Sequence, residues 1–365
     1  MNLLFLLIPI ALFLGIGIYL AVHIAKIPII AKYKKNKLFG AVIVVFLFVL
    51  MFLRVWSVLP IIFFLFGSYI IVEIVDSVLK RSVNEEIYKK WGRVYMNGAP
   101  AVVITVIIAV YAYINANTVI TTRYNISTEK TGMEDGIKSV MISDSHLGTI
   151  VKIDDMKKYC TQISEMEPDI VFLVGDIYDE STVKEDMINA CSYIGNIKSK
   201  YGIYYVNGNH DDGSYGNRNF RIADIEKEFE KNGVHILNDT SELIDNKFYV
   251  SGRIDRSFGE RASIAEIIKD NDMSKYNILL DHQPTETNDA AEKGIDLELC
   301  GHTHAGQIWP MGQLCELLGI NDLNYGIRNI GNYNLIVSSG IGGWGFPMRT
   351  SEHAEIVIVG INKNI

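Results

Sequence analysis

Five short polar fragments in the second half of the chain carry residue types that could do chemistry. In chain order they read Asp144-Ser145-His146, Gly175-Asp176, Gly208-Asn209-His210-Asp211, Asp281-His282 and Gly301-His302-Thr303-His304. Five of the eight histidines of the chain lie in these fragments. Imidazole nitrogens combined with carboxylate and amide oxygens, without a thiolate, favour divalent ions such as Mn, Fe or Zn. The fragments therefore predict a metal site.

The number of candidate ligands indicates more than one ion. A single tetrahedral zinc ion takes four ligands, whereas the fragments offer seven without counting His210. Seven ligands suit two ions that share a bridging carboxylate. Such a pair, about 3.5–4 Å apart, can hold a hydroxide nucleophile and clamp a phosphoryl oxygen during in-line displacement. His210 would then supply a proton or a positive charge to the leaving oxygen.

Each fragment follows a predicted β-strand. Runs rich in Val and Ile predict strands over 139–142, 170–174, 203–206, 248–250, 278–280, 297–299, 335–337 and 356–359. Amphipathic patterns predict helices over 154–166, 182–198, 221–232 and 264–270. In open α/β sheets the ligand crevice lies beyond the carboxyl ends of the strands, so all five fragments can reach one crevice. This order of elements is typical of a layered α/β domain.

The ordered series DSH, GDIYD, GNHD, H and GHTH resembles the signature of the calcineurin-like metallophosphoesterase superfamily, over residues 137–365. The downstream segments GHTHAGQIWP and SSGIGGWGFP resemble the bacterial membrane-associated branch of that superfamily, which includes relatives of UDP-2,3-diacylglucosamine pyrophosphatases. The resemblance implies a four-layer αββα sandwich with a dinuclear metal site.

The resemblance also implies a role for each matching residue. The first ion would be bound by Asp144, His146 and His304, the second by Asn209, His282 and His302, with Asp176 bridging the two. His210 matches the catalytic histidine of the family, and Asp211 matches the acid that commonly follows it, so both are predicted as catalytic residues. Asp179 completes the GDxxD pattern and is expected to orient its neighbours rather than to bind metal.

Four further features lie close to the fragments in sequence, and two of them, Asp281 and the segment 338–347, leave two interpretations open. Asp281 stands where relatives often have a small or hydroxyl residue, and it either hydrogen-bonds a ligating imidazole or merely ends a strand. Ala305 stands where this branch often has glycine. The glycine-rich segment 338–347 either brings its backbone close to a phosphate or acyl chain, or forms a tight turn between strands. Arg349 is a candidate phosphate contact.

The N-terminal third of the chain has a different composition. Residues 1–122 carry a net charge of +7 and the remaining 243 residues one of −15. Apolar runs cover 3–22, 38–53, 61–79 and 99–120, and about 20 such residues span a bilayer. The sequence therefore predicts a four-helix transmembrane region over 1–122, a linker over 123–136 and the metallophosphoesterase domain over 137–365.

The charges of the short loops predict the orientation in the membrane. Segments 23–37 and 80–99 each hold five Lys or Arg residues, whereas the break at 54–60 holds one. Loops rich in Lys and Arg stay in the cytoplasm, which places the catalytic domain outside. If 38–79 crossed only once, the domain would lie in the cytosol. Glu73 and Asp76 share one helix face, and we expect them to reach the interface beside Lys80 and Arg81 rather than to line an ion path.

Composition excludes several classes of protein. The apolar content of 49% excludes a disordered chain, and four cysteines in 365 residues exclude a disulfide-stapled miniprotein. The acidic second half excludes a nucleic-acid partner. The leading hypothesis is a multi-pass membrane phosphoesterase that hydrolyses a phosphoester or pyrophosphate bond of a lipid-linked or envelope substrate. The alternatives are a catalytically silent metal-binding scaffold, and a sensing or transport bundle with a phosphoesterase output module.

Overall fold

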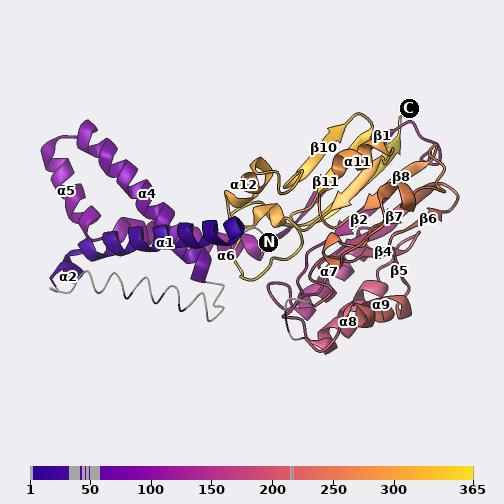
Figure 1. Cartoon of the computed structure of the whole chain (residues 1–365), viewed down its shortest axis with the longest axis horizontal. Coiled ribbons are helices and arrows are strands. Elements are labelled where there is room, and N and C mark those ends of the chain that lie inside the picture. The colour runs from indigo at the N-terminus through magenta and orange to yellow at the C-terminus, as the bar shows by residue number, and fades with distance from the viewer. Residues whose placement is uncertain are drawn as a thin grey trace. The chain divides into compact units, whose positions relative to one another are not determined.

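The computed structural model describes residues 3–32, 58–213, 216 and 218–364, together with positions 42, 46 and 49. The chain divides into two compact units, Met1–Tyr113 and Ile114–Ile365 (Figure 1). The division falls before the boundary predicted at residue 122, because the last turn of a helix belongs to the second unit.

The first unit is helical. Its described residues form α1 (Leu3–Lys26), α2 (Pro28–Ala31), α4 (Val58–Ser82), α5 (Glu85–Met96) and α6 (Ala99–Ala116), the last of which ends in the second unit. By length and composition, α4 and α6 are able to cross a membrane. Helices α1, α4 and α6 coincide with three of the predicted apolar runs, whereas the run 38–53 lies outside the described residues apart from three isolated positions. Four spans therefore remain a prediction.

The two acids of α4 have partners other than the expected ones. Glu73 accepts a hydrogen bond of 2.7 Å from the Tyr19 hydroxyl and lies against His23, both on α1. Asp76 accepts a hydrogen bond of 3.0 Å from the Trp91 indole on α5. These carboxylates therefore contact α1 and α5 and not the expected basic residues, Lys80 and Arg81, at the end of α4. The physical reason is that the face of α4 that carries Glu73 and Asp76 packs against α1 and α5.

The second unit contains two six-stranded sheets. The first has the order β1-β12-β2-β3-β4-β5 and consists of β1 (Val119–Thr128), β2 (Ile137–Ile142), β3 (Ile170–Val174), β4 (Ile203–Val206), β5 (Val234–Ile236) and β12 (Ala354–Lys363). The second has the order β10-β11-β9-β8-β7-β6 and consists of β6 (Thr240–Ile244), β7 (Phe248–Gly252), β8 (Tyr276–Leu280), β9 (Leu297–Cys300), β10 (Gly326–Ile330) and β11 (Tyr333–Val337). Within them β2-β3-β4-β5 and β7-β8-β9-β11 are parallel runs.

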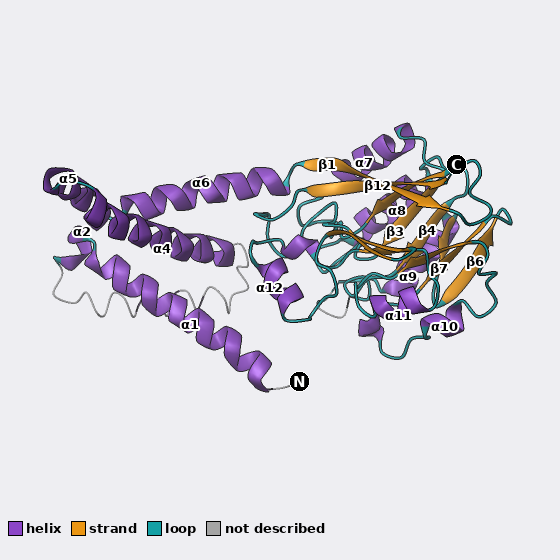
Figure 2. Cartoon of the chain, turned by 90° about the horizontal axis from the view of Figure 1, so that it is seen from above, coloured by secondary structure: helices purple, strands orange, loops and turns teal. Residues whose placement is uncertain are grey.

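Three apolar cores stack these elements into four layers. Figure 2 shows the helices and strands of this unit by secondary structure. One core lies between the first sheet and the helices α7 (Ile153–Glu165), α8 (Lys184–Gly195) and α9 (Ile222–Lys231), which cover the outer face of that sheet. Residues such as Phe172 and Leu280 form the core between the sheets. Short helices α10 (Ile264–Ile267) and α11 (Thr287–Glu292) cover the second sheet. The predicted four-layer αββα sandwich is confirmed.

The predicted linker over 123–136 is wrong in its first part. Strand β1 runs from Val119 to Thr128 and pairs in parallel with β12 along its whole length. Its sequence VITTRYNIST is rich in β-branched residues, which favour strands, but it is polar because β1 is an edge strand. Only Asn117 and Thr118 separate α6 from β1.

A buried carboxylate lies in the middle of the second sheet. Glu298 on β9 is fully buried and accepts a hydrogen bond from the Tyr333 hydroxyl. Burial, together with the nearby Asp281 carboxylate, raises the pKa of Glu298 to about 8. Because the folded state holds this proton more tightly than the unfolded chain, stability is lost as the pH rises from the usual pKa of a glutamate to about 8.

We therefore expect Glu298→Gln to remove a pH-dependent loss of stability. Relative to this variant, the wild-type protein should lose on the order of 3 kcal/mol of unfolding free energy between pH 5 and pH 8. Thermal unfolding of the full-length protein in detergent at both pH values measures the difference. A gap between the two proteins that does not change with pH would show that Glu298 is not protonated in the folded state.

Candidate metal centre

The predicted ligands all follow strands whose carboxyl ends meet. Asp144 and His146 follow β2, Asp176 follows β3, Asn209 follows β4, His282 follows β8, and His302 and His304 follow β9. The two parallel runs bring these loops to one edge of the sandwich, as expected for the crevice of an α/β sheet. Both sheets therefore contribute ligands, and the sandwich itself positions them.

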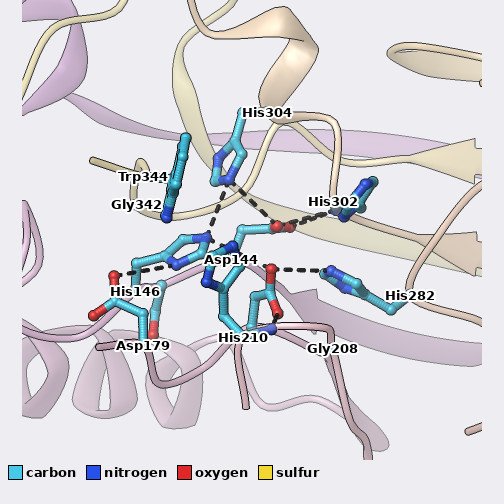
Figure 3. Close-up of polar contacts among 12 residues, drawn as sticks. Asp144, His146, Asp179, Gly208, His210, His282, His302, His304, Gly342 and Trp344 are labelled. Carbon is cyan, nitrogen blue, oxygen red and sulfur yellow. Dashed lines mark hydrogen bonds and ion pairs between the residues drawn. The ribbon is translucent and has the colours of Figure 1, made fainter. Parts of the chain in front are cut away.

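Asp144, His146 and His304 form one group of buried side chains that could hold a metal ion (Figure 3). Their nearest ligand atoms lie within 4.8 Å of one another. The Nε2 atoms of the two histidines are 3.1 Å apart, and His304 Nε2 is 3.6 Å from Asp144 Oδ1. Because nitrogens bound to one ion at about 2.1 Å each approach each other in this way, this spacing suits a shared cation.

Asp176, His282 and His302 form a second such group. His282 Nε2 lies 3.1 Å from Asp176 Oδ2. The other ring nitrogen of His282 is 2.9 Å from the Val174 carbonyl oxygen, to which it donates, so Nε2 is left to face Asp176. The same Asp176 oxygen lies 3.7 Å from His146 Nε2 of the first group. One carboxylate thus stands between the two groups.

Unpartnered polar atoms at this edge also fit divalent cations. Among the described residues, Asn209 Oδ1 and His304 Nδ1 are buried without a hydrogen-bond partner. Burial and the charge of His146 hold the pKa of His304 well below its usual range. Burial and the neighbouring His282 lower the pKa of His302 to about 4. His302 and His304 are therefore held in the neutral form that binds metal, whereas, despite burial, the neighbouring carboxylates raise the pKa of His146 and His282.

Asp179 and Asp211 hold the ligands in place from outside. Asp179 Oδ2 lies 3.3 Å from His146 Nδ1, which orients that ring as expected. The carboxylate of Asp211 accepts hydrogen bonds from the backbone N–H groups of Asp176, Tyr178 and Gly208 at 2.8–2.9 Å. Asp211 is fully buried. Its oxygens fix the loops after β3 and β4, and its catalytic role stays a prediction.

The backbone of the ligand loops is held in an uncommon conformation. Asp144, Asp176, His302 and His304 all have positive φ angles between 50° and 70°. Non-glycine residues in this region cost of order 1–3 kcal/mol each and concentrate at functional sites. Ala305 also has a φ of 51°, which explains why glycine suits its position. The fold thus pays a local energetic cost to direct these side chains.

Close packing around the carboxylates requires glycine. A Cβ atom on Gly208 would lie 2.3 Å from Asp176 Oδ1. A Cβ atom on Gly301 would lie 2.3 Å from Asp144 Oδ2. The glycines of the GNHD and GHTH fragments therefore let neighbouring backbone approach the two carboxylates.

Glu180 is a functional residue that the sequence reasoning missed. Its Oε1 atom lies 2.8 Å from Nδ1 of His210. The backbone N–H of His210 donates to Asp176 Oδ1 at 2.8 Å, and its ring centroid is 5.0 Å from that of His146. His210 thus lies beside the metal-ligand groups, and its Nδ1 atom is paired with Glu180. The available signal was the acid that directly follows the GDIYD fragment.

Two residues near the site have structural roles. The Asp281 carboxylate pairs with the Arg253 and Arg261 guanidinium groups at 3.0–3.1 Å rather than with a ligating imidazole. Arg349 is fully buried, and its guanidinium donates to backbone carbonyls that include Ser339 and Gly342. The interpretation of Arg349 as a phosphate contact is therefore wrong, because the side chain braces the glycine-rich loop.

The glycine-rich segment packs directly on the first metal-ligand loop. The N–H of Ile341 donates to the Ser143 carbonyl and that of Gly342 to the Asp144 carbonyl, both at 3.0 Å. The Trp344 ring lies 5.5 Å from the ring of His210 (Figure 3). The segment thus supports Asp144 and brings an aromatic side chain to the edge of the site.

Comparisons with known proteins identify the same family. Residues 137–306 match the model of the calcineurin-like phosphoesterase family. An uncharacterized metallophosphoesterase of Campylobacter jejuni is 30% identical over 72% of this chain and 68% of its own. One from Aquifex aeolicus is 30% identical over 71% of this chain and 97% of its own. A "Transmembrane protein with metallophosphoesterase domain" of Danio rerio is 29% identical over 70% of this chain but only 60% of its own.

These relatives bear on the superfamily and not on the narrower resemblance to UDP-2,3-diacylglucosamine pyrophosphatases, which stays a prediction. The matched region contains every predicted metal ligand, from Asp144 to His304. The chain therefore belongs to the calcineurin-like phosphoesterase family and is a metal-dependent phosphoesterase.

Proposed function

We propose that this chain is a membrane-anchored phosphoesterase with a two-metal centre, which hydrolyses a lipid-linked or envelope phosphate ester or pyrophosphate. The observation that carries the two-metal proposal is the position of Asp176. Its Oδ2 atom is 3.1 Å from His282 Nε2 in one ligand group and 3.7 Å from His146 Nε2 in the other. A single carboxylate in contact with both groups is suited to bridge two cations.

The seven predicted ligands would hold two cations. Asp144, His146 and His304 would hold one divalent cation, Asn209, His282 and His302 the other, and Asp176 both. Bound in this way, Mn, Fe or Zn ions supply charge neutralisation at the phosphoryl oxygens and lower the pKa of water. Buried carboxylates such as Asp179 hold the ligand side chains in their orientations. The ligands would therefore reorganise little during the reaction.

His210 would protonate the leaving oxygen from Nε2. Its Nδ1 faces Glu180 at 2.8 Å, so the carboxylate fixes the orientation of the ring. Once Nε2 has given up its proton, the neutral ring still donates from Nδ1 to Glu180. General acid catalysis of this kind contributes roughly 10²–10⁴-fold in rate. Glu180 acts through His210 and is a positioning residue.

The helices support a membrane anchor with the catalytic unit outside. Helix α5 is amphipathic and only 12 residues long, so it is too short to span and joins α4 to α6 at one membrane face. This joint carries Lys80 and Arg81 at the end of α4 and Lys89, Lys90 and Arg93 on α5. Because such loops stay in the cytoplasm, the far end of α6 and the phosphoesterase unit that follows would face outward.

Asp176→Asn tests the two-metal proposal. The change keeps the shape of the side chain but removes the charge that both ligand groups share, so we expect fewer metal ions per chain and at least a 100-fold loss of kcat/KM. Metal content and Mn²⁺-dependent hydrolysis of bis-p-nitrophenyl phosphate are measured on the full-length protein in detergent.

Asp135→Asn is the matched control, since Asp135 has a side chain that is 82% exposed and lies outside the site. The control should behave like the wild-type protein. An Asp176→Asn protein that retained both its metal content and its activity would contradict the proposal.

His210→Ala and Glu180→Gln test the proton donor. We expect His210→Ala to lower kcat by at least 100-fold with metal still bound, and Glu180→Gln to lower it about tenfold with little change in KM. Both losses should be larger for an ester with an alkyl leaving group than for a p-nitrophenyl ester, because the alkoxide needs a proton more.

The double variant separates positioning from a general structural effect. If Glu180 acts through His210, adding Glu180→Gln to His210→Ala costs no further activity. Additive losses, or equal losses for both leaving groups, would refute this role. A His210→Ala protein that keeps its metal and its full activity would contradict the assignment of His210, whereas a wild-type protein that binds metal without activity would favour the silent-scaffold alternative.

A further inference from the structure

An exposed apolar surface follows the GHTH fragment. It is formed by six side chains around helix α12 (Met311–Leu317), and we call it the Trp309 surface: Trp309, Met311, Leu314, Leu317, Leu318 and Ile320. Leu317 is 81% exposed, Leu318 73% and Trp309 65%. Apolar residues gathered and exposed in this way mark a contact surface rather than chance exposure.

Charge is nearly absent from this part of the chain. Within residues 305–321 the only charged residue is Glu316. Its carboxylate is held by Arg328 at 2.9 Å and by the backbone N–H of Asn324 at 3.3 Å. A surface with one neutralised charge can leave water at little electrostatic cost. Tryptophan is typical of side chains at the boundary between lipid headgroups and acyl chains.

Hydrogen bonds tie this surface to the end of helix α6. The N–H of Trp309 donates to the Thr350 hydroxyl at 3.0 Å. The Asn115 side chain, in the last turn of α6, donates to the carbonyls of Arg349 and Ser351 at 3.2 and 3.0 Å. One short loop, 349–351, is therefore held by the Trp309 surface on one side and by α6 on the other. All of these residues belong to the second compact unit.

The surface is also tied to the metal-ligand loop. His304 begins a 3₁₀ turn (His304–Gly306), and α12 contacts this turn. A Cβ atom on Gly306 would lie 2.1 Å from the backbone nitrogen of Gly312, so the two backbones are in direct contact. The side chain of Gln307 donates to the carbonyls of Trp344, Phe346 and Met348. The Trp309 surface and the metal-ligand loop are thus in direct backbone contact.

We propose that the Trp309 surface docks on the bilayer that α6 crosses, in the headgroup–acyl boundary of the outer leaflet. This inference rests on the membrane anchoring proposed above. The bilayer is favoured as the partner because the loop that anchors Trp309 also holds the point where the apolar helix ends and the catalytic unit begins. An apolar surface close to the end of a membrane-spanning helix can bury its side chains in the lipid, so it needs no protein partner.

Docking would give the catalytic unit a fixed orientation on the membrane. Ligand His304 lies five positions before Trp309, so insertion of the surface would hold the metal-ligand loop near the headgroups. A substrate whose phosphate is carried by a membrane amphiphile would then reach the site without leaving the bilayer. The substrate class is therefore that of membrane-resident phosphate amphiphiles.

Lipid quenching of site-specific fluorophores tests the docking. The full-length chain in a Cys315→Ala background, whose other cysteines are buried, carries an environment-sensitive dye at Leu317→Cys or Leu318→Cys. Val183→Cys is the matched control, because Val183 is an apolar residue of the same unit and is 55% exposed. Val106→Cys, on α6, reports the anchor itself. Each protein is placed in phosphatidylcholine–phosphatidylglycerol nanodiscs, with and without nitroxide lipids, at one chain per disc.

The proposal predicts that dyes at 317 and 318 are quenched by nitroxide lipids at least threefold more than the dye at 183. If position 106 is quenched but 317 and 318 are not, the anchor stands and the docking is refuted. If the dyes at 106, 317 and 318 all remain unquenched, both the membrane anchor and the docking are refuted. The phosphoesterase assignment is tested separately by activity. A second preparation holds two chains per disc. Dyes at 317 and 318 whose emission changes only in that preparation would overturn the proposal in favour of a second copy.

Discussion

The buried carboxylate of Asp176 is the constraint on which the rest of the catalytic unit depends. An ionised carboxylate taken out of water is strongly destabilising unless it is paired and hydrogen-bonded. Here His282 lies at 3.1 Å, the N–H of His210 donates at 2.8 Å, and the charges of the neighbouring histidines hold the pKa of Asp176 well below its usual range despite burial. The second carboxylate, Asp144, is also fully buried, and burial together with Asp176 raises its pKa. Two acids of this kind at one edge of the sandwich are the environment that divalent cations would stabilise.

The sandwich supplies what this constraint needs. Parallel strands from both sheets end at the same edge, so ligands distant in sequence converge without long loops. Asp211 then connects the loops after β3 and β4 through three backbone N–H groups. The positive φ angles of the ligands and the close approach of Gly208 and Gly301 show that the backbone is shaped around the carboxylates. The site is therefore a property of the whole fold and not of one loop.

The metal ligands could be predicted from the sequence because their signal is local. Each is a polar residue directly after an apolar strand, and their order along the chain is itself informative. The central strands were predictable for the same reason, since burial on both faces produces continuous apolar runs. The strands that the sequence did not predict, β1, β5, β6 and β10, are the four sheet edges, where exposure interrupts such runs.

The roles of the supporting residues could not be predicted because they depend on how loops meet. Glu180 contacts His210 thirty positions away. Arg349 has the chemistry of a phosphate ligand, yet it is fully buried and its Nη atoms donate to backbone carbonyls. Asp281 neighbours a ligand in sequence but pairs with two arginines. In each case the residue type was informative, and its partner was set by tertiary packing.

The central claim is that two cations share Asp176, and electron paramagnetic resonance of the full-length protein loaded with Mn²⁺ tests it most directly. Two Mn²⁺ ions bridged by one carboxylate, about 3.5–4 Å apart, are magnetically coupled. The account predicts a coupled-spin spectrum once two equivalents of Mn²⁺ have been added. A spectrum of isolated Mn²⁺ ions at saturation would contradict it.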